Sequence, residues 1–579
     1  MNSMGQNNKN PETLRSYQWF GSKTIRGFAH RQRFQQMGFR RQDFEGRPII
    51  GILNTWSEMS TCHYHMRERA NEVRRGVWKA GGFPVELSVM SLGEVMVKPT
   101  TMFYRNMLAM ETEEVLRSHP VDGAILMGGC DKTTPGLLMG AFTMDIPSIF
   151  VPAGPMLNGK WRGKTVGVGT ETKKYWDELR AGNITEEDWR ELETGMTRSN
   201  GTCCTMGTAS TMTSITEALG FTIPGASSIP AVDSAHPRMA TDAGERVVEM
   251  VWEDLKPSQV ATADAFHNAI VCYAALGGST NATIHLIAMA KRMGVEVTLD
   301  QMDQIARDVP VLTNLMPSGK YLMEDFHYAG GLNALLGRLG DKLCLNAITI
   351  SGRTLGESIE GATVYNDDVI LPRDRPLNDR PTMAVLYGNI CPNGAVIKPN
   401  AGSPELLQHT GPAVVFEDHA DFSTRIDDED LEVDENSILV LKNGGPVGGP
   451  GMAEWGDLQV PKKLLKKGVR DILRISDARM SGTRDGTIIL HVAPESAIGG
   501  PLSLVQTGDT IKFDFANRSL NVDLDEKELE RRRANWTPPK PVYQRGYGVI
   551  FSQHINQANE GMDFDFLSAP GGVLEPDIN

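Results

Sequence analysis

Residues 128–136 read Gly128-Gly129-Cys130-Asp131-Lys132-Thr133-Thr134-Pro135-Gly136 and follow an apolar run at 123–127. The run predicts a short buried strand, and the apolar residues 137–141 predict the start of a helix. A thiol, a carboxylate and an amine therefore stand at the end of a strand, where open α/β sheets bind ligands. Cysteine suits an iron–sulfur cluster or zinc and aspartate suits Mg²⁺, which indicates two different inorganic centres in one pocket. The stretch alone leaves open a buried cysteine beside an ordinary surface ion pair.

The same alternation of strand and helix continues on both sides of this stretch. Residues 48–54, 85–90 and 148–151 have the β-branched, apolar character of strands. Residues 65–79 and 102–118 have apolar residues at helical spacing. Alternating strands and helices, with polar residues after the strands, predict a parallel sheet covered by helices.

The pattern changes in the C-terminal third of the chain. From about residue 347, short β-rich segments are separated by Gly, Pro, Asn and Asp turns, which is typical of a barrel or sandwich. We therefore expect an α/β fold with a large N-terminal α/β domain at residues 15–375 and a mostly β, barrel-like domain at 376–579. Residues 1–14 are expected to form a disordered tail. The aromatic segment 536–567 is expected to pack back onto the first domain.

The composition excludes several classes of function. The chain has 579 residues, with 40% hydrophobic and 22% charged residues and a formal net charge of −14. This acidic balance, without a basic cluster containing aromatics, argues against nucleic-acid binding. No run of about 18 apolar residues is present, so we expect no membrane span. The polar N-terminus lacks the apolar segment of a signal peptide, and we expect a cytoplasmic protein.

The cysteines argue for a metal site made from distant segments. An odd number of cysteines in a long chain without secretion signals argues against a disulfide framework. No Cys-x-x-Cys pair is present, which argues against a zinc knuckle or a redox dithiol. The seven cysteines are Cys62, Cys130, Cys203, Cys204, Cys272, Cys344 and Cys391.

A glycine-rich segment at 444–451 resembles a phosphate-binding loop only loosely. It lacks the Lys-Ser/Thr pair that follows the glycines of a P-loop, so we reject that function. Its glycines instead predict a close backbone approach to a buried site.

Six segments together resemble the dihydroxy-acid and sugar-acid dehydratase family. Each is a weak signal alone, but they occur in the family's order, and the resemblance extends over residues 20–567. The segments are Thr61-Cys62-His63, residues 129–136, Gly201-Thr202-Cys203, Gly277-Gly278-Ser279-Thr280-Asn281-Ala282, Gly448-Gly449-Pro450-Gly451-Met452-Ala453-Glu454 and Asp477-Ala478-Arg479-Met480-Ser481-Gly482-Thr483.

The resemblance implies an iron–sulfur cluster held by Cys62, Cys130 and Cys203. Family members with all three cysteines hold a [2Fe–2S] cluster, and those without the first are thought to hold a [4Fe–4S] cluster. Three cysteines leave one iron position open, and an open iron can act as a Lewis acid on a leaving hydroxyl. Cys204 departs from many relatives, and we interpret it as a packing residue rather than a fourth ligand.

The resemblance also implies a Mg²⁺ site formed by Glu94, Asp131, Lys132 and Glu454. A lysine ammonium has no lone pair to coordinate a cation. In the family this lysine resembles a carbamylated one, which is an anionic oxygen ligand. Carboxylates and a carbamate form the hard oxygen set that Mg²⁺ prefers. Judged by itself, Glu94 would be a solvated loop acid.

Ser481 corresponds to the family's proposed base, and Thr483 is expected to hydrogen-bond nearby. A serine hydroxyl is a very weak acid, so an alkoxide would need Mg²⁺, backbone N–H groups or a helix N-terminus beside it. Without the resemblance, Ser481 would be interpreted as a helix cap.

The expected activity is removal of water from a 2,3-dihydroxy carboxylate, giving a 2-keto-3-deoxy acid. Residues 17–20 and the tail 545–567 resemble the branch that acts on sugar acids such as pentonates and hexonates. In this tail, His554 is either a substrate contact or a structural residue. The alternatives are a branched-chain dihydroxy-acid dehydratase and a sugar-acid-binding or iron-sensing protein without activity. We expect a homo-oligomer, either a dimer or a tetramer.

Overall fold

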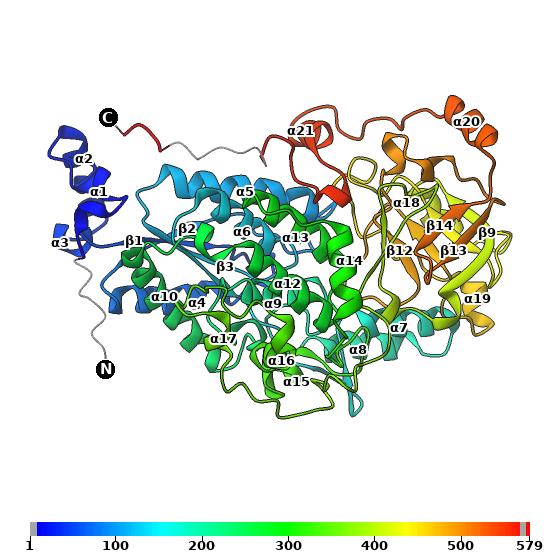
Figure 1. Cartoon of the computed structure of the whole chain (residues 1–579), viewed down its shortest axis with the longest axis horizontal. Helices are drawn as coiled ribbons and strands as arrows, with labels where there is room; N and C mark the ends of the chain where they lie inside the picture. Colours follow the sequence, from blue (N-terminus) through cyan, green and yellow to red (C-terminus); the bar gives the residue numbers. More distant parts are fainter. Residues whose placement is uncertain (1–8, 568–574, 579) are drawn as a thin grey trace.

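The computed structural model describes residues 9–567 and 575–578. Helices and a parallel sheet form the N-terminal part, and the C-terminal part at the other end is rich in short strands (Figure 1). The predicted α/β fold, with a parallel N-terminal sheet and a barrel-like C-terminal sheet, is confirmed. Among the residues that the structure describes, no helix has both the length and the apolar character needed to cross a membrane.

Four parallel strands form the N-terminal sheet in the order β2-β1-β3-β4. All residues of β1 (Ile49–Asn54) and β3 (Gly123–Gly128) are buried, as expected for central strands with helices on both faces. The edge strands are β2 (Phe83–Ser88), slightly earlier than predicted, and β4 (Ser148–Pro152). The chain passes from β1 to β2 and then returns beyond β1 to β3. The carboxyl ends of β1 and β3 therefore form the switch point of the sheet.

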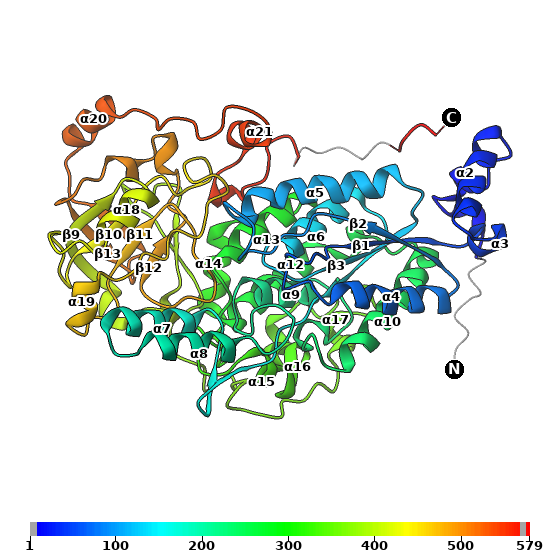
Figure 2. The same ribbon diagram turned by 180° about the vertical axis from the view of Figure 1, so that it is seen from behind.

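Two pairs of helices cover this sheet (Figure 2). α4 (Met66–Lys79) packs along α10 (Ala235–Glu253) on one face, and α5 (Thr101–Ser118) packs along α6 (Thr133–Met144) on the other. α6 begins at Thr133, before the predicted start at residue 137. Pro135 does not prevent this start, because it lies in the first turn of the helix, where proline is tolerated.

The other N-terminal helices surround this core. Every residue of α9 is buried, and α9 packs against α12. The helices are α1 (Tyr17–Phe20), α2 (Ile25–Gln36), α3 (Arg41–Phe44), α7 (Thr170–Ala181), α8 (Glu186–Met196), α9 (Thr208–Ala218), α11 (Pro257–Val260), α12 (Ala263–Leu276), α13 (Asn281–Arg292), α14 (Leu299–Asp308), α15 (Met323–Tyr328), α16 (Gly331–Leu339) and α17 (Leu355–Ser358), with a hairpin of β5 (Gly159–Trp161) and β6 (Lys164–Val166).

The C-terminal sheet has the order β14-β13-β9-β10-β11-β12-β8-β7 and mixes parallel and antiparallel pairs. A bridge between Tyr387, after β7, and Ser519, in β14, joins its two edges and nearly closes the barrel. Its elements are β7 (Ala384–Leu386), β8 (Ala395–Ile397), β9 (Gln408–Phe416), β10 (Ile438–Leu441), β11 (Arg474–Ser476), β12 (Ile488–Leu490), β13 (Thr510–Asp514) and β14 (Ser519–Val522), with helices α18 (His419–Arg425), α19 (Lys462–Lys466) and α20 (Glu526–Asn535).

The C-terminal extension, residues 536–567, returns to the N-terminal part, where Figure 1 shows it in red above α5 and α13. Phe551 in α21 (Tyr547–His554) packs with Phe103 of α5. The buried Arg105 side chain donates to the carbonyl oxygens of Gly561 and Met562 at 3.0 and 2.7 Å. The extension is thus attached to the N-terminal part by both aromatic and polar contacts.

The N-terminal segment differs from the expectation of disorder over residues 1–14. Pro11–Thr13 form a 3₁₀ helix and Leu14 is buried, because the chain is held by Ser16, whose backbone N–H and hydroxyl donate to Asp122. Residues 1–8 lie outside the described residues. The domain boundary between residues 375 and 376 stays a prediction.

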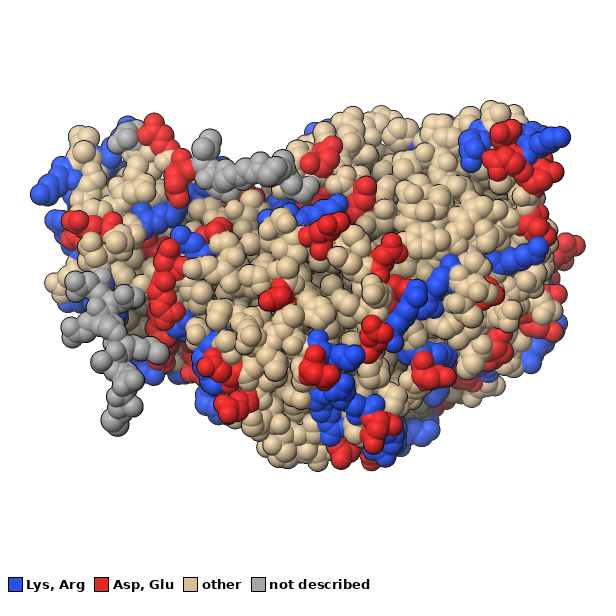
Figure 3. Space-filling model, in the orientation of Figure 1, with Lys and Arg blue, Asp and Glu red and all other residues tan. Residues whose placement is uncertain are grey.

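Charged side chains of both signs are mixed over one face of the molecule (Figure 3). On the face that Figure 3 shows, Lys and Arg are interspersed with Asp and Glu and do not gather in one patch. The expectation that the chain does not bind nucleic acid stays a prediction.

Candidate active site

A cavity of about 100 Å³ lies at the carboxyl edge of the N-terminal sheet. Residues from both parts of the chain line it, so the site is formed only when the two parts are together. The sequence-predicted residues in its wall are Cys62, Glu94, Cys130, Asp131, Cys203, Glu454, Ser481 and Thr483. Lys132 lies directly behind this wall.

Parallel pairing of the strands explains why distant N-terminal residues meet here. β1 leads to the loop of Cys62, β2 leads to the loop of Glu94, and β3 leads directly to Cys130. The carboxyl ends of neighbouring parallel strands share one edge of the sheet. The segment of Cys203 joins the same edge, because Thr202 forms a bridge with Pro155 shortly after β4.

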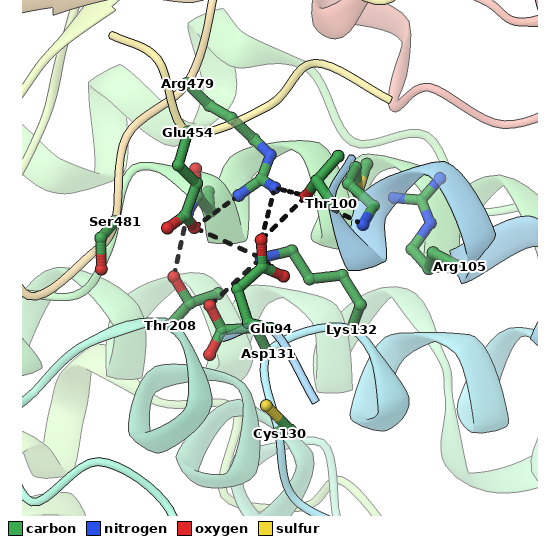
Figure 4. Close-up of polar contacts among 12 residues, drawn as sticks. Glu94, Thr100, Arg105, Cys130, Asp131, Lys132, Thr208, Glu454, Arg479 and Ser481 are labelled. Carbon is green, nitrogen blue, oxygen red and sulfur yellow. Dashed lines mark hydrogen bonds and ion pairs between the residues drawn. The ribbon is translucent and has the colours of Figure 1, made fainter. Parts of the chain in front are cut away.

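Three carboxylates surround the amine of Lys132, whose side chain is fully buried (Figure 4). The Lys132 Nζ atom lies 3.0 Å from Glu94 Oε2, 3.1 Å from Asp131 Oδ2 and 3.5 Å from Glu454 Oε1. Burial and Arg479 lower the pKa of Lys132, but the three carboxylates outweigh them and raise it. Lys132 is therefore an ammonium ion in this arrangement.

Arg479 is a second buried cation in this cluster. Its Nη1 atom lies 2.7 Å from Glu454 Oε1, and its Nη2 atom lies 3.3 Å from Glu94 Oε1. Nη2 also donates to Thr100 Oγ1 at 2.6 Å, and the Thr100 hydroxyl donates to Glu94 Oε1 at 2.8 Å. Burial raises the pKa of Glu94, but Lys132 and Arg479 outweigh it and lower that pKa to about 2.

The three carboxylates can hold a metal ion. Glu94, Asp131 and Glu454 each offer an oxygen atom, and these atoms lie within 4.8 Å of one another. Glu94 Oε2 is buried, and the charged group beside it is the Lys132 ammonium at 3.0 Å. Three carboxylates that converge on one buried cation fit the hard oxygen ligand set of Mg²⁺.

The three predicted cluster cysteines line one side of the cavity. The neighbouring Cys130 thiol, burial and nearby Cys203 raise the pKa of Cys62, so the Cys62 thiol is protonated without a metal beside it. Soft sulfur donors on one wall fit an iron–sulfur cluster. Cys204 is buried, does not line the cavity, and has a pKa raised to about 11 by burial. These facts agree with its predicted packing role.

His63 joins the loops of Cys62 and Cys130, a role that we did not predict. Its Nε2 atom accepts a hydrogen bond from the Cys130 backbone N–H at 3.1 Å. Burial lowers the pKa of His63 to about 3, so the ring is neutral and can accept. The Thr61-Cys62-His63 segment contained this residue, but only the fold shows its partner.

Ser481 lies in a tight turn and does not cap a helix, so the helix-cap interpretation is wrong. The Ser481 and Thr483 hydroxyl oxygens are 2.9 Å apart, as expected. A Cβ atom on Gly482 would lie 2.3 Å from Ser279 Oγ, so only glycine allows this approach. Asn281 holds the turn by donating to the Met480 carbonyl at 2.9 Å.

His554 is the candidate that the structure does not bring to the site. Among the described residues it does not line the cavity, and its ring pairs with Asp565 at 3.1 Å. Arg479, Thr100 and Asn281 are contacts that sequence reasoning missed. Arg479 and Asn281 lie inside segments of the family resemblance, which was the available signal, whereas Thr100 lies outside them.

Two family domains match most of the chain. The domain described as dihydroxy-acid/6-phosphogluconate dehydratase N-terminal matches residues 47–358, and the corresponding C-terminal domain matches residues 368–562. The chain therefore belongs to the dihydroxy-acid/6-phosphogluconate dehydratase family, whose members are hydro-lyases. The enzyme class that the resemblance implied is confirmed.

Three relatives show where the chain lies within this family. It is 57% identical to the 6-deoxy-6-sulfo-D-gluconate dehydratase of Pseudomonas putida, over 100% of both chains. It is 51% identical to the L-arabinonate dehydratase of Rhizobium leguminosarum bv. trifolii, over 97% of each chain. It is 38% identical to a dihydroxy-acid dehydratase of Caldanaerobacter subterraneus, over 94% of this chain and 98% of that one.

Proposed function

We propose that the protein removes water from a sugar acid, an aldonate, and gives a 2-keto-3-deoxy sugar acid. The observation that carries this proposal is one cavity that is lined by three thiols, three carboxylates and Ser481. Two relatives named for sugar acids are 57% and 51% identical to the chain, whereas the dihydroxy-acid dehydratase is 38% identical, as is a D-xylonate dehydratase.

We propose a [2Fe–2S] cluster on Cys62, Cys130 and Cys203 and Mg²⁺ on Glu94, Asp131, Glu454 and a carbamylated Lys132. When bound, these centres supply Lewis acidity toward the substrate carboxylate, the 2-hydroxyl and the leaving 3-hydroxyl. The chain's part is to hold both centres at one cavity. The thiols line the cavity, and the carboxylates point toward Lys132, as Figure 4 shows.

Charge balance supports carbamylation of Lys132. A carbamate turns one positive charge into one negative charge, and Mg²⁺ adds two positive charges. The formal charge of the buried cluster of carboxylates, Lys132 and Arg479 is therefore the same before and after the exchange. Arg479 stays paired with Glu94 and Glu454 in either state.

In this proposal Ser481, as the alkoxide, removes the C2 proton and becomes a hydroxyl, which then returns that proton to the leaving hydroxide. The C2–H bond breaks, its electrons form the C2–C3 double bond, and the 3-hydroxyl leaves, so that the proton and the hydroxide together make one water. The resulting enol tautomerises to the 2-keto acid. Thr483 positions the Ser481 oxygen through their 2.9 Å contact. The partly enclosed cavity limits access of bulk water.

A substrate panel tests the proposal. The anaerobically purified enzyme with Mg²⁺ is supplied with 6-deoxy-6-sulfo-D-gluconate, L-arabinonate or 2,3-dihydroxy-isovalerate, and 2-keto acid formation is measured. We expect kcat/KM to be higher for at least one sugar acid than for dihydroxy-isovalerate. The opposite order would assign the chain to the branched-chain reaction. No turnover of any dihydroxy acid would indicate a binding protein. The oligomeric state and the cytoplasmic location stay predictions.

A further inference from the structure

The glycine-rich loop at residues 444–451 leads directly to Glu454 and is held from behind by Glu495. The Glu495 side chain is fully buried, and its Oε2 atom accepts the backbone N–H groups of Val447 at 3.0 Å and Gly448 at 2.9 Å. A Cβ atom on Gly445 would lie 2.5 Å from the Glu495 Cβ atom, so glycine is needed for this approach. The glycines thus allow one carboxylate to fix the loop.

The C-terminal extension supplies the partner of Glu495. The Gln557 Nε2 atom donates to Glu495 Oε1 at 2.9 Å, and the Glu495 backbone N–H donates to Gln557 Oε1 at 2.9 Å. The amide and the glutamate therefore exchange two hydrogen bonds. Without Gln557, the Glu495 carboxylate would lose a side-chain donor in a buried setting and would be held only by the loop whose position it sets, through the backbone N–H groups of Val447 and Gly448.

The other side of the glycine-rich loop packs tightly against α5, and this packing fixes the backbone that leads to Glu454. A Cβ atom on Gly451 would lie 2.6 Å from the backbone nitrogen of Phe103 at the start of α5. Beyond Glu454, the Gly456 backbone N–H donates to the Arg479 carbonyl at 2.9 Å. The backbone of Glu454 is consequently set between the loop and the segment of Arg479.

We infer that Gln557 is a positioning residue for the metal site. It orients Glu495, which orients the glycine-rich loop, which in turn orients the Glu454 carboxylate toward Asp131 and Glu94. The extension is thereby part of the metal site and not only a cover on α5. The inference depends on the proposed function only in taking Glu454 as a metal ligand.

The test measures metal binding directly, with Mn²⁺ as the probe in place of Mg²⁺. Free Mn²⁺ is followed by electron paramagnetic resonance in titrations of the full-length holoenzyme. Loss of groups that orient metal ligands typically weakens metal affinity by about 10-fold or more. We expect the Mn²⁺ dissociation constant of Gln557→Ala to rise by about 10-fold, with the visible spectrum of the iron–sulfur cluster unchanged.

Gln553→Ala is the matched control. Gln553 lies in the same extension, is exposed, and makes no side-chain hydrogen bond in the described part of the chain. Its variant should bind Mn²⁺ like wild type. Gln557→Asn, which keeps an amide on a shorter side chain, should lie between Gln557→Ala and wild type, and it replaces the alanine variant if that one does not fold.

The outcomes separate the inference from the proposed function. Equal Mn²⁺ affinity in wild type and the Gln557 variants would overturn the inference and leave the metal site intact. Equal weakening in Gln553→Ala would overturn it as well, since the effect would then belong to the whole extension. A wild-type enzyme that binds no Mn²⁺ would overturn the proposed metal site and this inference with it.

Discussion

Ser481 is placed where the reaction requires a base, but a serine hydroxyl is ordinarily too weak an acid to be ionised at neutral pH. Its hydroxyl is in reach of Thr483 Oγ1 at 2.9 Å and of the Thr483 backbone N–H at 3.4 Å. These two groups are the protein donors nearest to a Ser481 alkoxide. The close contact of Gly482 with Ser279 keeps the turn from opening. An oxyanion of this kind depends on preorganised donors and nearby cations.

Replacing Ser481 by alanine should remove the base and leave the site assembled. We expect Ser481→Ala to keep its cluster and its Mg²⁺ affinity and to lose kcat by several powers of ten, since the lost group acts only in the transition state. Thr483→Ala should be milder, at a cost of about 1–3 kcal/mol for a buried hydrogen bond. Exchange of the C2 hydrogen with solvent deuterium is the measurement. Unchanged exchange in Ser481→Ala would assign the base to another group.

Lys132→Arg tests the carbamylation of the buried lysine. A guanidinium keeps the positive charge among the carboxylates but can neither be carbamylated nor coordinate a metal. We expect the variant to fold, to lose Mg²⁺ binding and to be inactive even at high Mg²⁺. Isothermal titration with Mg²⁺ and mass spectrometry of wild type for a carbamate are the measurements. Activity near that of wild type would remove Lys132 from the metal site.

At the scale of elements, the loops after β1 and β3 and the segment before α9 present the thiols. Because these segments meet at one edge of the sheet, three cysteines far apart in the chain face one cavity. The neutral His63 ring connects two of the loops through the Cys130 backbone. The cysteines thus act as one set, and the loss of any one should release the cluster.

The cysteine variants test this set. Cys62→Ser, Cys130→Ser and Cys203→Ser should each lose the visible absorption of a [2Fe–2S] cluster, whereas Cys204→Ser should retain it because Cys204 does not line the cavity. Iron analysis should give about two irons per chain in wild type, as expected for this cluster type. A full cluster in Cys62→Ser would contradict the assignment.

The packing of α10 on β4 should make the fold sensitive to acid. His236 in α10 is fully buried, its Nε2 lies 2.9 Å from the Pro152 carbonyl oxygen, and its Nδ1 accepts from Arg69 at 3.1 Å. Burial, together with His65 and Arg69, lowers the pKa of His236 to about 3. Below the unfolded pKa of about 6.5, only the unfolded state binds the proton, so stability falls as the pH falls toward about 3.

We expect His236 to contribute a loss of about 1 kcal/mol per pH unit below pH 6.5. Urea unfolding followed by tryptophan fluorescence at pH 7.5, 6.5 and 5.5 measures it. The loss between pH 6.5 and 5.5 should be smaller in His236→Gln than in wild type. His119→Gln, which changes an exposed histidine, should keep the wild-type slope. Equal slopes in all three proteins would show that His236 takes up its proton in the folded state.

At the scale of the whole molecule, the site exists because the barrel-like part closes over the edge of the parallel sheet. Glu454, Arg479 and Ser481 come from the C-terminal part, and Glu94 and Lys132 come from the N-terminal part. Arg479 pairs with a carboxylate from each part, and its ion pair with Glu94 crosses the junction. The metal site and the contact between the two parts therefore depend on the same buried charges.

Much of this arrangement could be predicted from local sequence patterns. Apolar runs such as residues 123–127 indicate buried strands, because a strand covered on both faces requires apolar side chains on both. The position of Cys130, Asp131 and Lys132 after such a run placed them at the binding edge of the sheet. The family resemblance supplied the remaining site residues, and the cavity contains or adjoins all of them.

The partners of these residues were decided only by the tertiary structure. Arg479 with Thr100, His63 with the Cys130 backbone, and Glu495 with Gln557 join segments distant in the chain. Hydrophobic periodicity indicates which face of a helix or strand is buried. It does not indicate which polar group of another element lies opposite a given side chain. That choice depends on the packing of whole elements, because a hydrogen bond requires its two atoms to lie within about 3 Å of each other.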